Sequence, residues 1–319
     1  MLRLNVARSA AEIETLSAVW DSLFHPDLSL FQTFRWNRLA AQIFASREAP
    51  YFVFAENENG AAILPAVIDT KSRTISFAGE RLFDYRDYLG RGDRAPIVAA
   101  WQQLGSLDMP LSITAVCRAE SEIWKGMPKH FFSRAPRLQR NAISPEEFAK
   151  GHSRAFSRLR KLERMGLAIH QYSGDSPIIR QIYTRRAAQS AEGELFHDAA
   201  RVEFMIAACR EEGTRCEVFS LEHGSTLAAA LVTFRDGDYR RFYTIYYDHK
   251  WARFSPGVSL LFEVSRRSLE QGINFDLMTG EQGYKLRIAR SAQDLFTVNA
   301  SASQLREFFP GAVSGDKAA

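Results

Sequence analysis

The chain has 319 residues, and because domains usually hold about 100 to 200 residues we predict two of them. Its composition, 46% hydrophobic and 24% charged with a net charge of +4, excludes wholesale disorder and lacks the dense positive charge of dedicated nucleic-acid-binding proteins. Three cysteines without CxxC spacing and seven scattered histidines exclude a disulfide framework and indicate no metal site.

The first half of the chain predicts alternating helices and strands. Ser9 and Glu12 form a capping box, which predicts a helix that continues through Leu23. A second apolar-periodic stretch ends near Phe44. Strands are expected on both sides of a turn that ends in Asn59-Gly60, and a helix is expected before the last strand of this half. These predicted elements are strands at 51–55, 61–68, 73–78 and 111–116, with the helix near 96–104.

The second half predicts a different order of elements. A new helix starts at Ser144-Pro145, which supplies a cap and a proline at the first helical position, and Gly166 can close it. Two helices then precede an antiparallel meander of three strands, and a long helix follows the meander. The predicted elements are a strand at 167–172, helices at 177–190 and 199–211, strands at 216–221, 227–234 and 239–247, a helix to 270, and strands at 273–277 and 295–299.

The entry to the long helix has the features of an anion site. It reads Phe254-Ser255-Pro256-Gly257-Val258-Ser259, in which Pro256 fixes the turn and Gly257 permits close approach of the backbone. The amides of Gly257, Val258 and Ser259 are expected to donate hydrogen bonds, aided by the positive end of the helix dipole. The position after a three-stranded meander favours a phosphate-binding role over a plain helix cap.

The order of elements and several local motifs resemble one family. The chain is similar to GNAT acyltransferases of the CelD/BcsL (BioF2-like) type. The motifs that carry the resemblance are Tyr247-Asp248, Phe254-Ser255-Pro256-Gly257 with Leu260-Leu261, Phe275-Asp276-Leu277 with Gly280, and Tyr284-Lys285. Weaker matches lie in the first half, at Phe31-Gln32 with Trp36, Leu64-Pro65 and Asp84-Tyr85 with Asp87-Tyr88.

The resemblance implies a fold class and domain boundaries. It implies an α/β (α+β) fold of tandem GNAT-like domains, each with a mixed, mostly antiparallel sheet flanked by helices. We place a degenerate domain at 1–143, the acyltransferase domain at 144–309 and a flexible tail at 310–319. Since no apolar run approaches the ~20 residues of a membrane-spanning helix, we expect no membrane span and a cytoplasmic location.

The resemblance also implies the chemistry. The expected cofactor is acetyl-CoA or another acyl-CoA, held by Ser255, Pro256, Gly257, Val258 and Ser259, with Lys285 near a phosphate. Tyr284 is the expected general acid for the departing thiolate. Asp276, Asp248 and Glu281 complete the catalytic candidates. The expected acceptor is an amine or a sugar, in exopolysaccharide or cellulose biosynthesis.

Two alternatives remain open from the sequence. The basic helix that carries Arg154, Arg158, Arg160, Lys161 and Arg164 fits a Fem-like transferase that takes its acyl group from charged tRNA. The chain could instead be a non-catalytic GNAT-like subunit of a polysaccharide synthase. The three interpretations differ in what the chain binds: acyl-CoA for the acyltransferase, charged tRNA for the Fem-like transferase, and neither for the non-catalytic subunit.

Overall fold

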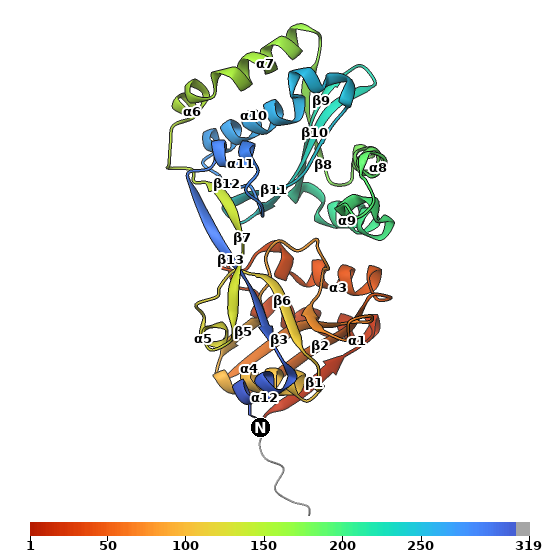
Figure 1. Cartoon of the computed structure of the whole chain (residues 1–319), viewed down its shortest axis with the longest axis vertical. Helices are drawn as coiled ribbons and strands as arrows, with labels where there is room; N and C mark the ends of the chain where they lie inside the picture. The colour runs from red at the N-terminus through yellow and green to blue at the C-terminus, as the bar shows by residue number, and fades with distance from the viewer. Residues whose placement is uncertain (311–319) are drawn as a thin grey trace, which may run out of the picture. The chain divides into compact units, whose positions relative to one another are not determined.

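The computed structural model describes residues 1–310, which fall into two compact units (Figure 1). Unit 1 contains Met1–Ser133 together with the described residues from Asp294 onward, and unit 2 contains Arg134–Gln293. Each unit has a mixed, mostly antiparallel sheet flanked by helices, which confirms the predicted fold class. Apart from Pro310, the predicted tail lies outside the described residues.

The boundaries of the two compact units differ from the domain boundaries that we proposed from the sequence, 1–143 and 144–309. The chain enters unit 2 at Arg134, ten residues before Ser144, because the end of the strand β7 (Lys129–Leu138) pairs with a strand of unit 2. It returns to unit 1 at Asp294, because β13 (Ser291–Ala300) pairs with β6 (Leu111–Val116) of that unit. These crossings depend on long-range strand pairing, which leaves no local mark in a sequence.

Unit 1 is built on a sheet ordered β1-β2-β3-β4-β6-β13, with β5 also paired to β3. The β2–β3 hairpin turns between Asn57 and Gly60, as the Asn-Gly signal predicts. Its elements are β1 (Arg3–Ala7), α1 (Ala10–Glu14), α2 (Ser17–Leu23), η1 (Leu30–Gln32), α3 (Phe34–Ile43), β2 (Glu48–Asn57), β3 (Gly60–Asp69), β4 (Ile75–Phe77), β5 (Leu89–Gly92), α4 (Arg94–Gly105), β6 (Leu111–Val116), α5 (Glu122–Lys125) and α12 (Ala302–Phe308).

Unit 2 is built on a sheet ordered β7-β12-β11-β10-β9-β8. Strands β8 to β11 pair antiparallel in succession, whereas β11 and β12 pair parallel. Its elements are α6 (Pro145–Gly151), α7 (Ser153–Arg164), β8 (Ala168–Ser173), α8 (Ile178–Gln189), η2 (Leu195–His197), α9 (Ala199–Glu212), η3 (Gly213–Arg215), β9 (Cys216–His223), β10 (Thr226–Asp236), β11 (Tyr239–Tyr247), η4 (His249–Phe254), α10 (Pro256–Glu270), β12 (Asn274–Asp276) and α11 (Gly283–Ile288).

Helix α10 lies against one face of this sheet and α8 and α9 lie on the other (Figure 1). The first nine of the eleven residues of β10, from Thr226 to Phe234, are apolar residues or threonines. All of them except Thr226 are buried, because helices cover both faces of the sheet. Helix α7 packs in turn on α10, through buried Phe156, Leu159 and Leu162. The basic residues of α7 are exposed.

The structure divides two of the predicted helices and adds strands. The helix predicted to continue from Ser9 through Leu23 is two helices, α1 and α2, with Thr15 as the C-cap of the first and Leu16 as the N-cap of the second. The helix predicted from Ser144 to Gly166 is two helices, α6 and α7, which are separated at His152 (φ −118°, ψ 29°). Gly166 does close the second of them, with φ 88°. The sequence pattern did not predict β1, β5 or β7. Among residues 1–310, every helix is too short or too polar to span a bilayer.

Candidate functional site

The first turn of α10 presents backbone donors. Ser255 adopts the left-handed conformation (φ 49°, ψ 53°), and its side chain does not cap the helix. Among the described residues, the amides of Gly257 and Val258 have no hydrogen-bond partner. The Ser259 amide was expected to be a free donor, but it donates a hydrogen bond to the Ser255 carbonyl at 2.9 Å. Two amides rather than three are therefore open at the positive end of a 15-residue helix.

Gly257 packs closely against β11. A Cβ atom at this position would lie 3.0 Å from Ile245 Cδ1 and 3.1 Å from Ile245 Cγ1 on β11. Since real Cβ contacts are rarely so short, the glycine lets α10 approach the strand closely. This contact is made with β11, whereas the close approach of a phosphate to the Gly257 backbone stays a prediction.

Strand β12 borders the site and is very short. Its parallel ladder with β11 runs for three residue pairs, from Tyr239 with Asn274 to Arg241 with Asp276. β12 ends there, and Met278 then turns the chain with φ 60°. The remaining part of β11, which leads toward α10, therefore has no β12 residue beside it.

Asp276 is fully buried and already paired. Its Oδ2 accepts a hydrogen bond from Arg241 Nη1 at 2.6 Å and lies 3.5 Å from Arg137 Nε. Its Oδ1 accepts the Met278 amide at 2.9 Å. A carboxylate held by two guanidinium groups and one amide is suited to fixing the turn after β12.

Lys285 is also buried, and its amine points away from solvent. Nζ donates to the Thr279 carbonyl at 2.6 Å and lies 5.7 Å from the centre of the Phe242 ring. The amine therefore ties α11 to the segment that precedes it. This contact holds the neighbouring Tyr284 in place.

Tyr284 is half-buried against the core of unit 2. Burial raises the pKa of its phenol, and the nearby Arg186 guanidinium of α8 partly offsets this rise. The phenol therefore stays protonated at neutral pH and is able to donate a proton.

Asp248 and Glu281 occupy different environments. The Asp248 carboxylate accepts the Lys250 amide at 2.9 Å and caps η4 directly after β11. Glu281 is exposed and lies 3.7 Å from Arg134 Nη1. Asp248 is thus fixed near the end of β11, whereas Glu281 sits on a solvent-facing turn.

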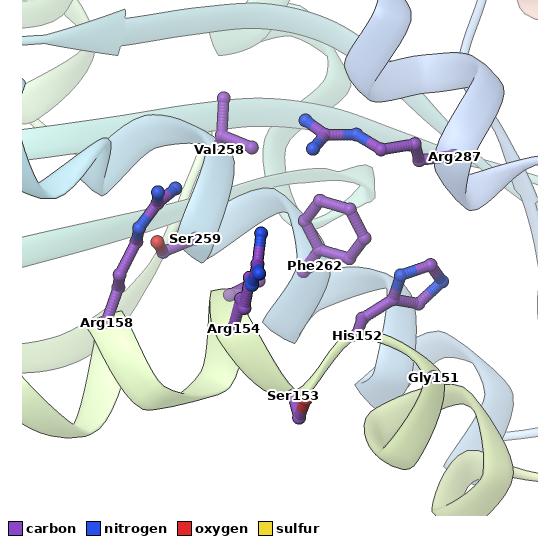
Figure 2. Close-up of a pocket in the computed structure, with 10 residues that line it drawn as sticks. Gly151, His152, Ser153, Arg154, Arg158, Val258, Ser259, Phe262 and Arg287 are labelled. Atoms are coloured by element: carbon purple, nitrogen blue, oxygen red, sulfur yellow. The ribbon is translucent and has the colours of Figure 1, made fainter.

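A pocket beside α10 was not predicted from the sequence. It has a volume of about 320 Å³ and lies between α7, α10 and α11 (Figure 2). Its polar lining includes His152, Arg154, Arg158, Ser259 and Arg287. The spacing of Arg154 and Arg158 on one face of a basic helix was the available signal, but Arg287 and Ser259 join them only in the folded unit.

His152 closes one side of this pocket. Its ring centre lies 4.6 Å from that of Phe148 and 4.7 Å from that of Phe262. Burial lowers the pKa of this imidazole, and the positive charges of Arg290 and Arg287 lower it further. The ring is thus held in its neutral form.

Comparison with known proteins finds one family that is similar to part of the chain. Residues 149–286 match the family model described as acetyltransferase (GNAT) domain. No curated protein sequence matches the chain significantly.

Three solved structures share the fold over almost the whole chain. The C-terminal domain of a provisionally named lysylphosphatidylglycerol synthetase from Agrobacterium fabrum has 11% identity and a TM-score of 0.61, covering 94% of this chain and 95% of its own. A crystal structure of FemX has 10% identity and a TM-score of 0.57, covering 92% and 96%. A tandem GNAT protein from the clavulanic acid biosynthesis pathway has 10% identity and a TM-score of 0.54, covering 95% and 99%. The chain therefore has the fold of tandem GNAT proteins, and its residues 149–286 are similar to the acetyltransferase (GNAT) domain family.

Proposed function

We propose that the chain transfers an acyl group from acyl-CoA, with acetyl-CoA as the first candidate, to an amine on the acceptor. The observation that carries this proposal is the open first turn of α10, where the Gly257 and Val258 amides lack a partner among the described residues. Two unpaired amides at a helix N-terminus favour a bound anion such as the CoA pyrophosphate. The family of residues 149–286 supports the same reaction class.

The proposed transfer uses the residues around this turn. The donor supplies a thioester, whose carbon forms the new bond to the acceptor nitrogen while its bond to sulfur breaks. Tyr284 gives its phenolic proton to the departing sulfur and regains a proton from solvent. Asp248, which is fixed at the end of β11, is the proposed acceptor of the proton that the amine loses, with Glu281 as the second candidate.

Asp276 and Lys285 have positioning roles in this proposal. Both are buried with their charges already bonded, Asp276 to Arg241 and Lys285 to the Thr279 carbonyl. They fix the two ends of the segment that leads from β12 to α11. Because Tyr284 lies in the first turn of α11, we propose that this fixed segment orients its phenol.

The proposed acceptor follows from the family resemblance. An amine or sugar in exopolysaccharide or cellulose biosynthesis, as for CelD/BcsL-type proteins, fits an acyltransferase of this build. A screen of amino sugars with a free-thiol assay would identify the acceptor, since each transfer releases one equivalent of CoA thiol.

Thermal unfolding tests the donor. At about 100 times its dissociation constant, a ligand that binds only the folded protein adds about 2.7 kcal/mol to stability. We expect acetyl-CoA, or a longer acyl-CoA, to raise the melting temperature accordingly. The absence of a shift with every chain length would overturn acyl-CoA as the donor.

A Fem-like transferase that uses charged tRNA is the second candidate. It is favoured by the exposed positive residues of α7, among them Arg154, Arg158 and Arg160. Binding that weakens steeply with salt is expected for such contacts. Retardation of charged tRNA at low salt, without any effect of acyl-CoA, would favour this function over the first.

A further inference from the structure

The pocket between α7, α10 and α11 concentrates positive charge. Arg154 and Arg158 reach it from α7 and Arg287 reaches it from α11, and in Figure 2 the three guanidinium groups converge around Ser259 and Phe262. No residue that lines the pocket is acidic. Among residues 1–310, none of the three arginines forms an ion pair. Uncompensated positive charge in a concave site attracts an anion.

Ser259 gives an independent indication of a ligand. Its side chain is 1% exposed, yet its Oγ has no hydrogen-bond partner among the described residues. Figure 2 shows this oxygen directed toward Arg158. Buried hydroxyl groups are nearly always hydrogen-bonded, so an unpaired one that lines a pocket is accounted for by a ligand that accepts a hydrogen bond from it.

His152 shows the same lack of a partner on another side of the pocket. Its Nε2 is buried without a hydrogen bond among the described residues, while its ring is fixed between Phe148 and Phe262. Arg287 is held in turn over the Phe262 ring, with Cζ 5.9 Å from the ring centre. Two unsatisfied groups and three guanidinium groups thus surround one cavity of about 320 Å³.

We propose that this pocket binds a terminal phosphate group, with Arg154, Arg158 and Arg287 as its charge partners and Ser259 Oγ as a hydrogen-bond donor. A phosphomonoester matches the site because it carries up to two negative charges and several acceptor oxygens. Planar guanidinium groups bind such oxygens in pairs. The pocket adjoins the first turn of α10, since Val258 also lines it, but its charge partners are side chains of α7 and α11.

Inorganic phosphate, titrated into the full chain by calorimetry, tests the pocket. We expect saturable binding by the wild-type protein and at least about tenfold weaker binding by Arg158→Gln and by Arg287→Gln, because each loses a charged donor. Arg160→Gln is the matched control, since Arg160 belongs to the same helix but lines a neighbouring hollow. Absent binding, or equal binding by all four proteins, would overturn the proposal.

Ser259→Ala separates ligand binding from folding. Because the hydroxyl has no partner in the described structure, we expect its removal to leave the melting temperature of the phosphate-free protein unchanged or slightly higher. Phosphate affinity should fall severalfold. An unchanged affinity would contradict the role of Ser259 in the site.

Binding of acetyl-CoA and of acetyl-3'-dephospho-CoA tests which ligand supplies the phosphate. This experiment rests on the proposed acyl-CoA function. If the ribose 3'-phosphate of CoA occupies the pocket, acetyl-CoA should bind at least about tenfold more tightly than acetyl-3'-dephospho-CoA, and Arg158→Gln should abolish the difference. Equal binding of both donors, with pocket-dependent binding of inorganic phosphate, would assign the pocket to a separate phosphorylated ligand. Phosphate binding without any CoA binding would overturn the proposed function and retain the pocket.

Discussion

Helix α4 comes after β5 in unit 1 and helix α10 comes after β11 in unit 2, yet the first turns of the two helices differ. In unit 1, Asp93 caps α4: its carboxylate accepts the Ala95 amide at 3.2 Å and a hydrogen bond from Asn57 at 2.8 Å. In unit 2, Ser255 leaves the first turn of α10 without a side-chain cap. The chain's own carboxylate therefore occupies the positive end of one helix, while the other is open to an external anion. The difference explains why a donor site is proposed in unit 2 alone.

The negative charge of Asp93 adds to this difference between the first turns of α4 and α10. The hydrogen bond from Asn57, followed by that from the Ala95 amide, lowers the pKa of the Asp93 carboxyl group. The group therefore stays ionised at the helix end across the neutral range. A second anion brought to this turn would meet a like charge.

The largest expected effect concerns Tyr284, the proposed acid of unit 2. Tyr284→Phe removes the proton donor but keeps the ring, so we expect kcat to fall by about 100-fold to 10,000-fold with little change in donor affinity. Steady-state kinetics combined with donor titration measure the two quantities separately. Equal losses in both would show that Tyr284 serves packing rather than proton transfer.

Ser255→Asp gives α10 a carboxylate like that of α4. The left-handed conformation tolerates Asp, so the fold should be kept, while like-charge repulsion should weaken acyl-CoA binding by about 100-fold. Ser255→Asn is the control of the same shape without the charge, and it should bind nearly as the wild type does. Similar affinities for Asp and Asn would place the phosphates elsewhere.

The buried Glu48 predicts a pH response in unit 1. Its carboxylate accepts the Gly79 and Glu80 amides at 3.1 Å and 2.9 Å, but burial raises its pKa from 4.5 to about 7, with Arg86 opposing the rise. The folded protein thus holds a proton that the unfolded chain releases, so stability falls as pH rises from about 4.5 through 7, by about 3 kcal/mol at most.

Hydrogen exchange of the β2 and β3 amides measures this local stability across the pH range. Glu48→Gln cannot titrate and should remove the slope. A wild-type stability that rises over the same interval would show that the ionised carboxylate, with its two amide bonds, is the favoured form.

The smallest expected effect concerns the cap of α4. Asp93→Ala removes the acceptor of the Ala95 amide and should lower the melting temperature of unit 1 slightly, because capping at an exposed helix end contributes little to stability. Acyl-CoA binding should be unaffected, and Asp93→Asn should retain most of the cap. Weaker acyl-CoA binding by the Ala variant would contradict the assignment of the donor site to unit 2.

The sequence by itself determined the order of elements in unit 2 from β8 to β12 and the entry of α10. These features are local: the turns at Gly224 and Gly237 adopt φ 56°, and Pro256 begins the helix as its fixed φ favours. Tyr284 could be placed on the segment after β12 for the same reason. The sequence did not show that Asp276 and Lys285 are already bonded within the fold.

Only the tertiary structure decided where the chain passes between units and which side chains meet. Strands β7 and β13 are set by pairing with residues more than a hundred positions away, so no local pattern marks them as crossings. The phosphate pocket likewise joins Arg154 and Arg158 to Ser259 and Arg287 through the packing of α7 on α10. Local features of the sequence, such as caps and turn residues, specified the helices and turns. Burial and long-range strand pairing decided which charged side chains lie close together.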